Sequence, residues 1–263
     1  MTTPNLNSNP NELVHENSEL AYKPERKAKI QHVQETVVKV HVWQMPVRVF
    51  HWLNALSIIL LMITGIYIGN PFLGATIPED AYYSFVMGWA RYIHFFSAFL
   101  FTINLLVRWY WVFKGNRYAT SNPFRKIFWI ETWETVKFYL FLKNKKPHYV
   151  GHNPLAQLSY WIFIGLGSIV MIFTGYFLYF EPQPESFFGA FFFAWVPIVF
   201  GGDSFTIRSL HHLVAWSFMI FMVVHIYMAF REDFLQRNGT MSSIFTGYKT
   251  EPKKAVGEKD EQK

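Results

Sequence analysis

The stretch that decides the fold is IRSLHHLVAWSFMIFMVVHIYMAF, Ile207 to Phe230, an apolar segment that carries three histidines. At a rise of about 1.5 Å and a rotation of about 100° per residue, His211 and His225 lie roughly 21 Å apart along a helix axis but only about 40° apart around it. His212 points roughly 140° away from His225 by the same geometry. The stretch therefore predicts one membrane-length helix with two imidazoles on a shared face, one near each end.

Composition places the chain among helical membrane proteins. Of its 263 residues, 51% are hydrophobic and 20% are aromatic, which is too apolar for a soluble domain of this size. There is no cysteine. That absence excludes disulfides, thiolate-bound zinc, iron–sulfur clusters and covalently attached c-type haem, so any haem must be held without thioether bonds.

Four segments are long enough to cross about 30 Å of hydrocarbon. These predicted spans are residues 47–69, 88–113, 155–180 and 207–230. Residues 187–200 are also apolar, but they are too few to span and contain Pro197, which predicts an interfacial or re-entrant element. Residues 127–142 carry two glutamates and a lysine on one helical stripe, which predicts a helix lying in the membrane surface.

The predicted fold is therefore all-α, an integral membrane four-helix bundle occupying residues 37–250. Residues 1–36 are polar and lack an apolar run, which predicts a disordered tail, and residues 251–263 form a second, charged tail. No signal-peptide pattern precedes the first span, so we expect that span to be the anchor. The alternating valines of residues 38–42 predict a short extended piece before Pro46 begins the first helix.

Basic residues are distributed unevenly between the loops. Lys and Arg gather before the first span, between the second and third, and after the fourth, whereas loops 70–87 and 181–206 contain none. The positive-inside rule places the basic segments and both termini in the cytoplasm. We therefore expect a multi-pass protein of the cell inner membrane. This bias also explains the net charge of +6 without a nucleic-acid partner.

The membrane histidines can be paired by depth. His51 starts the first span on the cytoplasmic side, and His94 lies near the outer start of the second. Pairing by level gives His94 with His211 for an outer haem and His51 with His225 for an inner haem. A lone histidine on an apolar helix is usually a satisfied core group, but four ionisable residues matched in pairs inside spans indicate function. We expect five further histidines at the surface: His15, His32, His41, His148 and His152.

An arginine stands three residues before three of these histidines, at Arg48, Arg91 and Arg208. That offset is one helical turn towards the nearer membrane surface, where a haem propionate would lie. Snorkelling to the interface explains Arg48 equally well. Arg91 and Arg208 are the only basic residues predicted on the outer side, which favours pairing with a negative charge there.

Several motifs resemble those of one family, in the same order. Residues 48–65, RVFHWLNALSIILLMITG, are similar to the first-helix signature of the b-type cytochrome subunit of membrane-bound nickel–iron hydrogenases, and residues 88–95, GWARYIHF, to its second-helix counterpart. The further motifs are GHNPLAQ at 151–157, SLHHLVAW at 209–216, HIYMAFRED at 225–233 and GY at 247–248. The resemblance covers about residues 38–250 and extends to the related formate dehydrogenase cytochrome b subunits. The long N-terminal tail departs from the family pattern.

The resemblance implies a non-catalytic electron-transfer subunit of a hydrogen:quinone oxidoreductase in the respiratory chain. It implies two b haems, a quinone acceptor, and two partners at the periplasmic face, an iron–sulfur small subunit and a nickel–iron large subunit. The small subunit adds its own membrane helix, for which residues 187–200 are a candidate dock; a segment that only covers the bundle end is the alternative. Within such a complex, the chain anchors the hydrogenase among membrane lipids and tunes its haems.

Small and polar residues complete the candidate sites. Gly65 and Gly175 each follow a threonine near the outer end of a span, where a glycine lets a haem edge or a helix approach; helix packing alone explains them equally well. Asn54 and Arg231 lie near the inner histidines and are candidates for the quinone site. A backbone cap is an equally good role for Asn54.

The sequence is compatible with two other functions. The same di-haem bundle could serve another membrane dehydrogenase, of the formate or thiosulfate type. A histidine-based metal transporter is less favoured, because the four histidines form two levels too far apart to share one ion.

Overall fold

The computed structural model describes residues 37–72, 85–115, 118, 123–144 and 148–253. The predicted tail at 1–36 and most of the predicted tail at 251–263 lie outside these ranges. The chain divides into two units, residues 39–250 and residues 1–38 with 251–263. The described helices and the candidate sites belong to residues 39–250.

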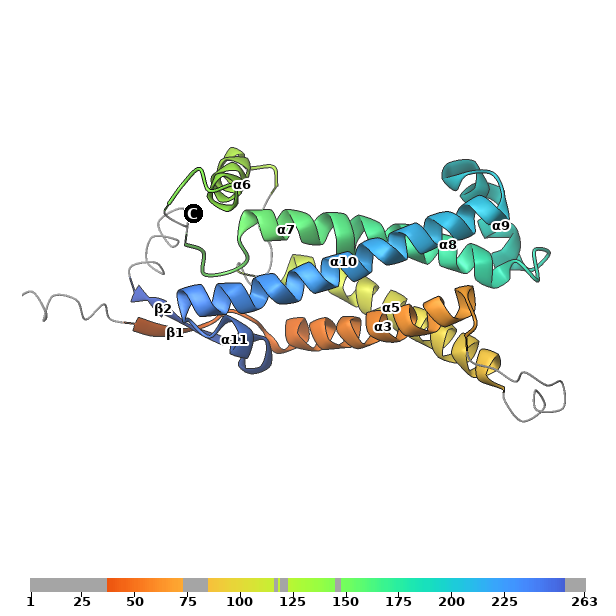
Figure 1. Cartoon of the computed structure of the whole chain (residues 1–263), viewed down its shortest axis with the longest axis horizontal. Coiled ribbons are helices and arrows are strands. Elements are labelled where there is room, and N and C mark those ends of the chain that lie inside the picture. The colour runs from red at the N-terminus through yellow and green to blue at the C-terminus, as the bar shows by residue number, and fades with distance from the viewer. Residues whose placement is uncertain (1–36, 73–84, 116–117, 119–122, 145–147, 254–263) are drawn as a thin grey trace, which may run out of the picture. The chain divides into compact units, whose positions relative to one another are not determined.

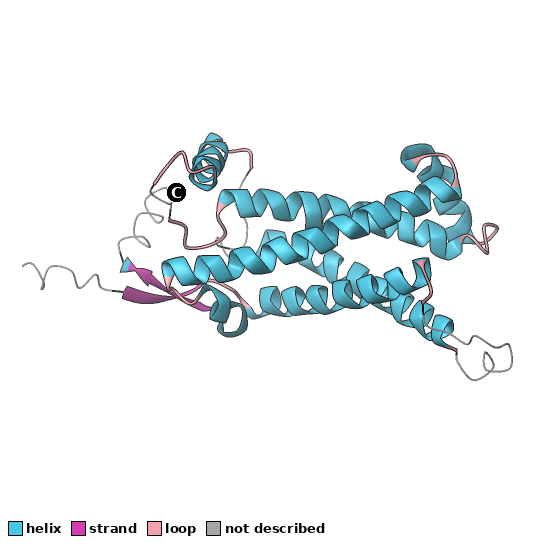
Figure 2. Ribbon diagram, viewed as in Figure 1, coloured by secondary structure: helices cyan, strands magenta, loops and turns pink. Residues whose placement is uncertain are grey.

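Four helices in this unit are long and apolar enough to cross a membrane, which confirms the predicted all-α, four-span fold. They are α3 (Met45–Gly69), α5 (Val86–Lys114), the continuous helix formed by α7 (Pro154–Tyr160), η1 (Trp161–Leu166) and α8 (Gly167–Phe180), and α10 (Ser204–Gln236). Figure 2 shows that helices make up almost all of this unit.

The long helices associate in pairs. In residues 39–250, α3 packs along α5, and α10 packs along α8, with a smaller contact between α5 and α8 (Figure 1). Side chains on α5 therefore meet α3, and side chains on α10 meet α8. This pairing determines which residues lie next to His94 and His211.

Local signals explain where the helices begin. Pro46 lies in the first turn of α3, where its fixed φ suits the helix. The Asn153 side chain accepts from the Ala156 N–H at 2.7 Å before α7, and that of Asp203 from the Thr206 N–H at 2.9 Å before α10. α10 is longer than the predicted 207–230, because the Asp203 cap adds residues at its start and polar turns continue it to Gln236.

Two shorter helices occupy the segments predicted to be interfacial. α6 (Lys126–Tyr139) and α9 (Phe187–Phe200) have 14 residues each, too few to span a bilayer. α6 packs on α7, and α9 packs on α8, so the two lie near opposite ends of the bundle (Figure 1). Stacked rings hold α9 in place, with Phe177 and Phe193 centred 4.4 Å apart.

The distribution of side chains fits a protein surrounded by lipid. Small polar residues such as Ser57, Ser168 and Thr174 are buried between helices, whereas large apolar residues such as Ile63 and Ile220 are more than half exposed. Small and hydroxylated residues let membrane helices approach closely, and the exposed apolar faces can contact acyl chains. Small polar side chains thus lie between the helices, while large apolar side chains cover the outside.

A π-helical segment, η1, interrupts the third span. Just after it, a Cβ placed on Gly167 would lie 2.9 Å from the Phe218 ring of α10. The absent side chain therefore allows a close approach between α8 and α10. No sequence pattern predicts this π-helix.

A two-stranded sheet pairs a strand that precedes the first span with one that follows the fourth. β1 (Val37–His41), the predicted extended piece, pairs with β2 (Tyr248–Pro252), which follows α11 (Thr240–Thr246). Gly247, at a φ of 89°, makes the turn into β2, and its carbonyl accepts from the Val42 N–H at 2.9 Å. A side chain would be strained at this φ.

Candidate functional site

The outer site begins with His94 on α5, which faces Thr64 on α3. The Thr64 hydroxyl lies 2.6 Å from the Leu60 carbonyl and 2.9 Å from Nδ1 of His94. Since the single hydroxyl proton is donated to the carbonyl, the oxygen accepts from the Nδ1–H of His94. This tautomer leaves Nε2 unprotonated and able to bind a metal.

The second pair of long helices repeats this arrangement at His211. The Thr174 hydroxyl on α8 lies 2.6 Å from the Val170 carbonyl and 2.8 Å from Nδ1 of His211. His211 therefore also carries its proton on Nδ1, and its Nε2 is free. The two imidazoles predicted to lie in the outer half of the bundle are therefore oriented in the same way, by a threonine on the neighbouring helix.

A glycine follows each of these threonines and gives the histidine ring its space. A Cβ placed on Gly65 would lie 3.2 Å from Cε1 of His94, and one on Gly175 would lie 3.2 Å from Cε1 of His211. Both distances are shorter than ordinary van der Waals contact. In the structure, the group that approaches each glycine is thus a histidine ring.

The inner histidines are held differently. The rings of His51 and His225 are 6.3 Å apart, so α3 and α10 bring the predicted inner pair together. Phe221 stacks on His225 at 5.7 Å, and the Tyr160 hydroxyl lies 3.4 Å from Nδ1 of His225. Nδ1 of His51 is buried and has no hydrogen-bond partner among the described residues. Ring packing, rather than a close hydroxyl, positions this pair.

His212 lies apart from both pairs, as the helical geometry predicts. Its side chain is exposed and faces α3, where a Cβ on Gly69 would lie 2.9 Å from its Cε1. His211 faces α8 instead. Adjacent histidines on α10 therefore contact different helices.

The three arginines have different surroundings. Arg208 forms an ion pair with Glu181 and donates from Nε to the Ser204 hydroxyl at 3.3 Å. Arg48 donates to the Phe245 carbonyl, while its Nε is buried without a partner in the described part of the chain. Arg91 is exposed. No sequence pattern indicates the pairing with Glu181, which offsets the charge of Arg208.

The two residues predicted near the quinone make separate contacts. The side-chain amide of Asn104 on α5 donates to Asn54 and, at 3.1 Å, to the Phe50 carbonyl. Asn54 thus helps to join α3 to α5. The guanidinium of Arg231 instead faces α6, 5.3 Å from the Tyr139 ring centre.

His152 corrects the expectation that all the remaining histidines are surface residues. Its ring packs against Trp43 at 4.6 Å and Tyr160 at 4.9 Å, inside the bundle end. Burial, and then the nearby charge of Lys249, lower the pKa of His152 to about 3, so its ring is neutral at neutral pH. His41 and His148 are exposed as predicted, and His15 and His32 lie outside the described residues.

The donor set fits haem better than a bare metal ion. Within the described ranges, His, Cys, Asp and Glu side chains form no group of three or more that could hold a metal. Haem supplies four ligands of its own and needs only axial groups from the protein, which paired histidines provide. The fixed Nδ1–H tautomers of His94 and His211, and the unpaired Nδ1 of His51, are consistent with coordination through Nε2.

The sequence indicates the four histidines, but it does not indicate that threonine hydroxyls orient two of them. Thr64 and Thr174 carried a signal, a Thr-Gly pair repeated in the first and third spans. Tyr160 carried none, because its contact with His225 depends on the packing of α7 against α10.

Several known proteins are similar to this chain over most of its length. Residues 42–247 match the family model described as prokaryotic cytochrome b561. The chain is 37% identical over 221 residues to a "Probable Ni/Fe-hydrogenase B-type cytochrome subunit" of Cupriavidus necator, covering 82% of this chain and 89% of the relative. For the protein of the same description from Azotobacter vinelandii, the identity is 38% over 223 residues, covering 82% and 92%. A "Probable Ni/Fe-hydrogenase 1 B-type cytochrome subunit" of Escherichia coli is 37% identical over 230 residues, covering 84% and 95%.

Proposed function

Because the chain belongs to the prokaryotic cytochrome b561 family, we propose that it passes electrons from a nickel–iron hydrogenase through two b haems to the quinone pool. It is a hydrogenase-associated b-type cytochrome subunit that acts in membrane electron transfer. The number of haems, their ligands and the quinone acceptor are the parts that we propose.

The observation that carries the proposal is the arrangement of histidines on two levels. His211 and His225 are separated by 14 residues on one helix, or roughly 21 Å at the α-helical rise. His94 is the proposed partner of His211, and His51 that of His225. Each bound haem would supply an iron that accepts and releases one electron. Haems at two levels would let electrons cross most of the bilayer.

The chain's own residues orient the ligands and set their surroundings. Thr64 and Thr174 hold Nδ1–H of the outer imidazoles, and Gly65 and Gly175 leave room for the rings. Arg48, Arg91 and Arg208 are the proposed partners of the haem propionates. By accepting from Nδ1–H, Thr64 and Thr174 would increase the electron density of the imidazoles that would hold the haem, which would tune its reduction potential.

We infer that electrons enter at the outer level and leave at the inner one. The loops without Lys or Arg face the periplasm in this proposal, where the hydrogenase small and large subunits would bind, and α9 is the proposed contact for the small subunit's membrane helix. The inner pair lies on the basic, cytoplasmic side of the inner membrane, near Asn54. Replacing Asn54 with Leu should slow quinone reduction and leave both haems bound; unchanged turnover would remove Asn54 from the site.

The decisive experiment is haem quantification on the purified protein, with a reduced-minus-oxidised spectrum. We expect two b haems per chain, and hydrogen should reduce both in the purified native complex. One haem or none would overturn the two-level arrangement. The partner co-purified with the chain tests its assignment to a hydrogenase, since a formate or thiosulfate dehydrogenase would contradict it.

A further inference from the structure

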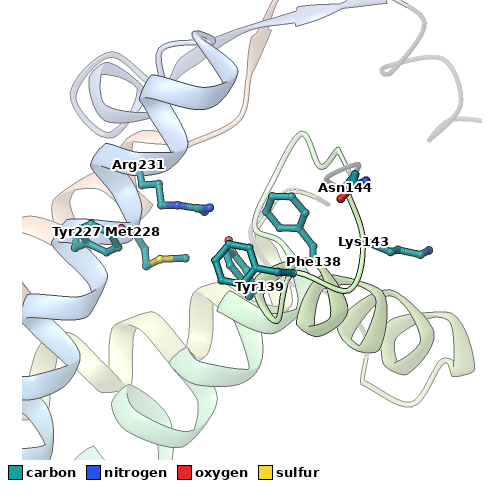
Figure 3. A pocket seen from close by; sticks show the side chains of 8 residues that line it. Phe138, Tyr139, Lys143, Asn144, Tyr227, Met228 and Arg231 are labelled. Atoms are coloured by element: carbon teal, nitrogen blue, oxygen red, sulfur yellow. The ribbon is translucent and has the colours of Figure 1, made fainter.

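A pocket of about 400 Å³ lies between α10 and the end of α6. Tyr227, Met228 and Arg231 line it from α10, and Phe138 and Tyr139 from α6, with Phe141, Lys143 and Asn144 completing the wall. Figure 3 shows Arg231 and Met228 facing Phe138 and Tyr139 across the opening. None of the histidines proposed as haem ligands lines it.

Two buried polar atoms beside this pocket lack a partner of normal geometry. Nη1 of Arg231 and the hydroxyl of Tyr139 make no such hydrogen bond to a described residue, and the two side chains interact weakly with each other. The guanidinium lies over the rings of Tyr139 and Phe138, 5.3 and 5.8 Å from their centres. A buried donor that lacks an acceptor is unfavourable, and more so when it is charged. The pocket therefore favours an occupant that accepts hydrogen bonds and carries negative charge.

Among the nearby cations, Arg231 is the one placed to pair with a negative charge in the pocket. Lys143 and Lys137 both form ion pairs with Glu134, so that one carboxylate holds both ammonium groups and leaves one net positive charge on α6 and the turn that follows it. In Figure 3, the Lys143 side chain extends away from Arg231. Burial, and then the charge of Glu232, raise the pKa of Tyr139, so its hydroxyl keeps its proton at neutral pH and can donate.

The pocket also adjoins surfaces suited to acyl chains. Tyr227, Val223 and Ile220 follow one another along α10 and are each more than 60% exposed, forming an apolar track that leads from the pocket towards the middle of the span. Phe141 is 89% exposed and has a φ of 61°, a conformation that places an aromatic ring at the turn after α6. Aromatic and basic residues at a helix end are typical of the membrane–water interface.

We propose that this pocket binds the phosphate group of an anionic phospholipid, with Arg231 and Tyr139 donating to the phosphate and the acyl chains lying along α10. An arginine fork matches phosphate oxygens in both charge and geometry. A quinone headgroup is neutral and would leave the charge of Arg231 unmatched. The inference does not depend on the proposed haem ligands.

The test measures lipid binding to the haem-loaded protein in detergent after lipid removal, by native mass spectrometry during titration with phosphatidylglycerol or phosphatidylcholine. We expect saturable binding of one phosphatidylglycerol per chain, tighter than binding of phosphatidylcholine. Arg231→Gln should weaken it about 10-fold or more, as expected for loss of a charged hydrogen bond. Tyr139→Phe, which removes only the hydroxyl, should have a smaller effect in the same direction.

Lys126→Gln is the matched control, because Lys126 is an exposed cation at the other end of α6. It should bind phosphatidylglycerol as the native chain does. Equal affinity of the native chain and Arg231→Gln would overturn the proposal, as would equal affinity for the two lipids. Displacement by millimolar inorganic phosphate would indicate a free-phosphate site, and displacement by a quinone analogue would assign the pocket to the acceptor. Haem spectra of each variant test its folding separately. A failure of the two-haem proposal is therefore distinguishable from a failure of the lipid-binding proposal.

Discussion

The outer and inner pairs of histidines are built on different principles. At the outer level, His94 and His211 each donate from Nδ1 to a threonine hydroxyl, at 2.9 and 2.8 Å. At the inner level, His225 lies 3.4 Å from the Tyr160 hydroxyl, and Nδ1 of His51 has no partner among the residues described. Short hydrogen bonds fix the outer rings, whereas aromatic neighbours hold the inner ones.

This difference has an electronic consequence for the proposed haems. An axial imidazole that donates from Nδ1 is more electron-rich, and it stabilises oxidised iron more than a ring without an acceptor does. The outer haem should then have the lower midpoint potential. Electrons entering outside would move downhill to the inner haem, which is the direction that quinone reduction requires.

The largest expected effect comes from removing a ligand. His94→Ala or His211→Ala should abolish the outer haem, and hydrogen should then reduce no haem in the complex with its hydrogenase. His51→Ala or His225→Ala should leave an outer haem that hydrogen still reduces, while quinol formation stops. Stopped-flow spectra that follow haem reduction and quinol formation separately would measure both.

His212→Ala is the control for that series, because its ring is exposed and faces Gly69. It should retain both haems. Loss of a haem in His212→Ala, with both retained in His211→Ala, would show that the assignment of ligands on α10 is wrong.

Filling the space beside an outer ring should have the next largest effect. Gly65→Ala or Gly175→Ala places a methyl group 3.2 Å from a histidine carbon, so the ring must shift and the outer haem should be bound less tightly. Haem content after detergent washing, compared with the native chain, measures this loss. Gly165→Ala is the control, since its Cβ would meet nothing closer than a carbonyl at 3.8 Å. Equal haem loss in all three variants would contradict the argument.

Removing an outer acceptor should shift a potential without losing the haem. Thr64→Val or Thr174→Val deletes a hydrogen bond worth about 1 kcal/mol; only the part of that energy specific to oxidised iron raises the outer midpoint potential, so the rise should be at most about 40 mV. A spectroelectrochemical titration measures the shift. Thr102→Val is a suitable control, because the Thr102 hydroxyl bonds to the Ala98 carbonyl at 2.8 Å and not to a histidine. A change in the inner potential alone would reverse the assignment of levels.

The smallest effect should follow the weakest contact. Tyr160→Phe removes a hydroxyl that is 3.4 Å from Nδ1 of His225, close to the limit for a hydrogen bond, and keeps the ring that packs against it. The inner midpoint potential should therefore move less than the outer one does in the threonine variants. The same titration measures it, and a larger shift would show that the inner pair also depends on a hydroxyl.

Much of the fold could be predicted from the sequence, because hydropathy and helix length are local properties. All four spans, the two shorter helices predicted to be interfacial and the extended piece at β1 correspond to observed helices and strands, although the membrane position of the shorter helices stays a prediction. The last two turns of α10 were missed because they leave the apolar region, where hydropathy gives no signal. β2 and η1 depend on pairing and packing with distant residues, which no local pattern reveals.

The candidate site was predictable only in part, for a related reason. Helical periodicity fixes the face on which His211 lies, but it does not say which helix that face meets. The roles of Thr64 and Thr174 follow from the pairing of α3 with α5 and of α8 with α10. His152 was misassigned because a residue in a loop has no periodicity from which burial could be inferred.

The repeated Thr-Gly pair relates the two helical hairpins by an approximate two-fold symmetry. In the outer half, α3 supports His94 of α5 in the way that α8 supports His211 of α10. Counting 14 residues onward from each histidine reaches His225 on α10 but Arg108 on α5, so the symmetry ends before the inner level. Nη1 of Arg108 is buried and has no partner among the described residues. In the proposed arrangement, α5 would carry a buried cation at the level where α10 carries a ligand, so an electron reaching the inner level would meet a positive charge, and the two ends of the bundle would not be interchangeable.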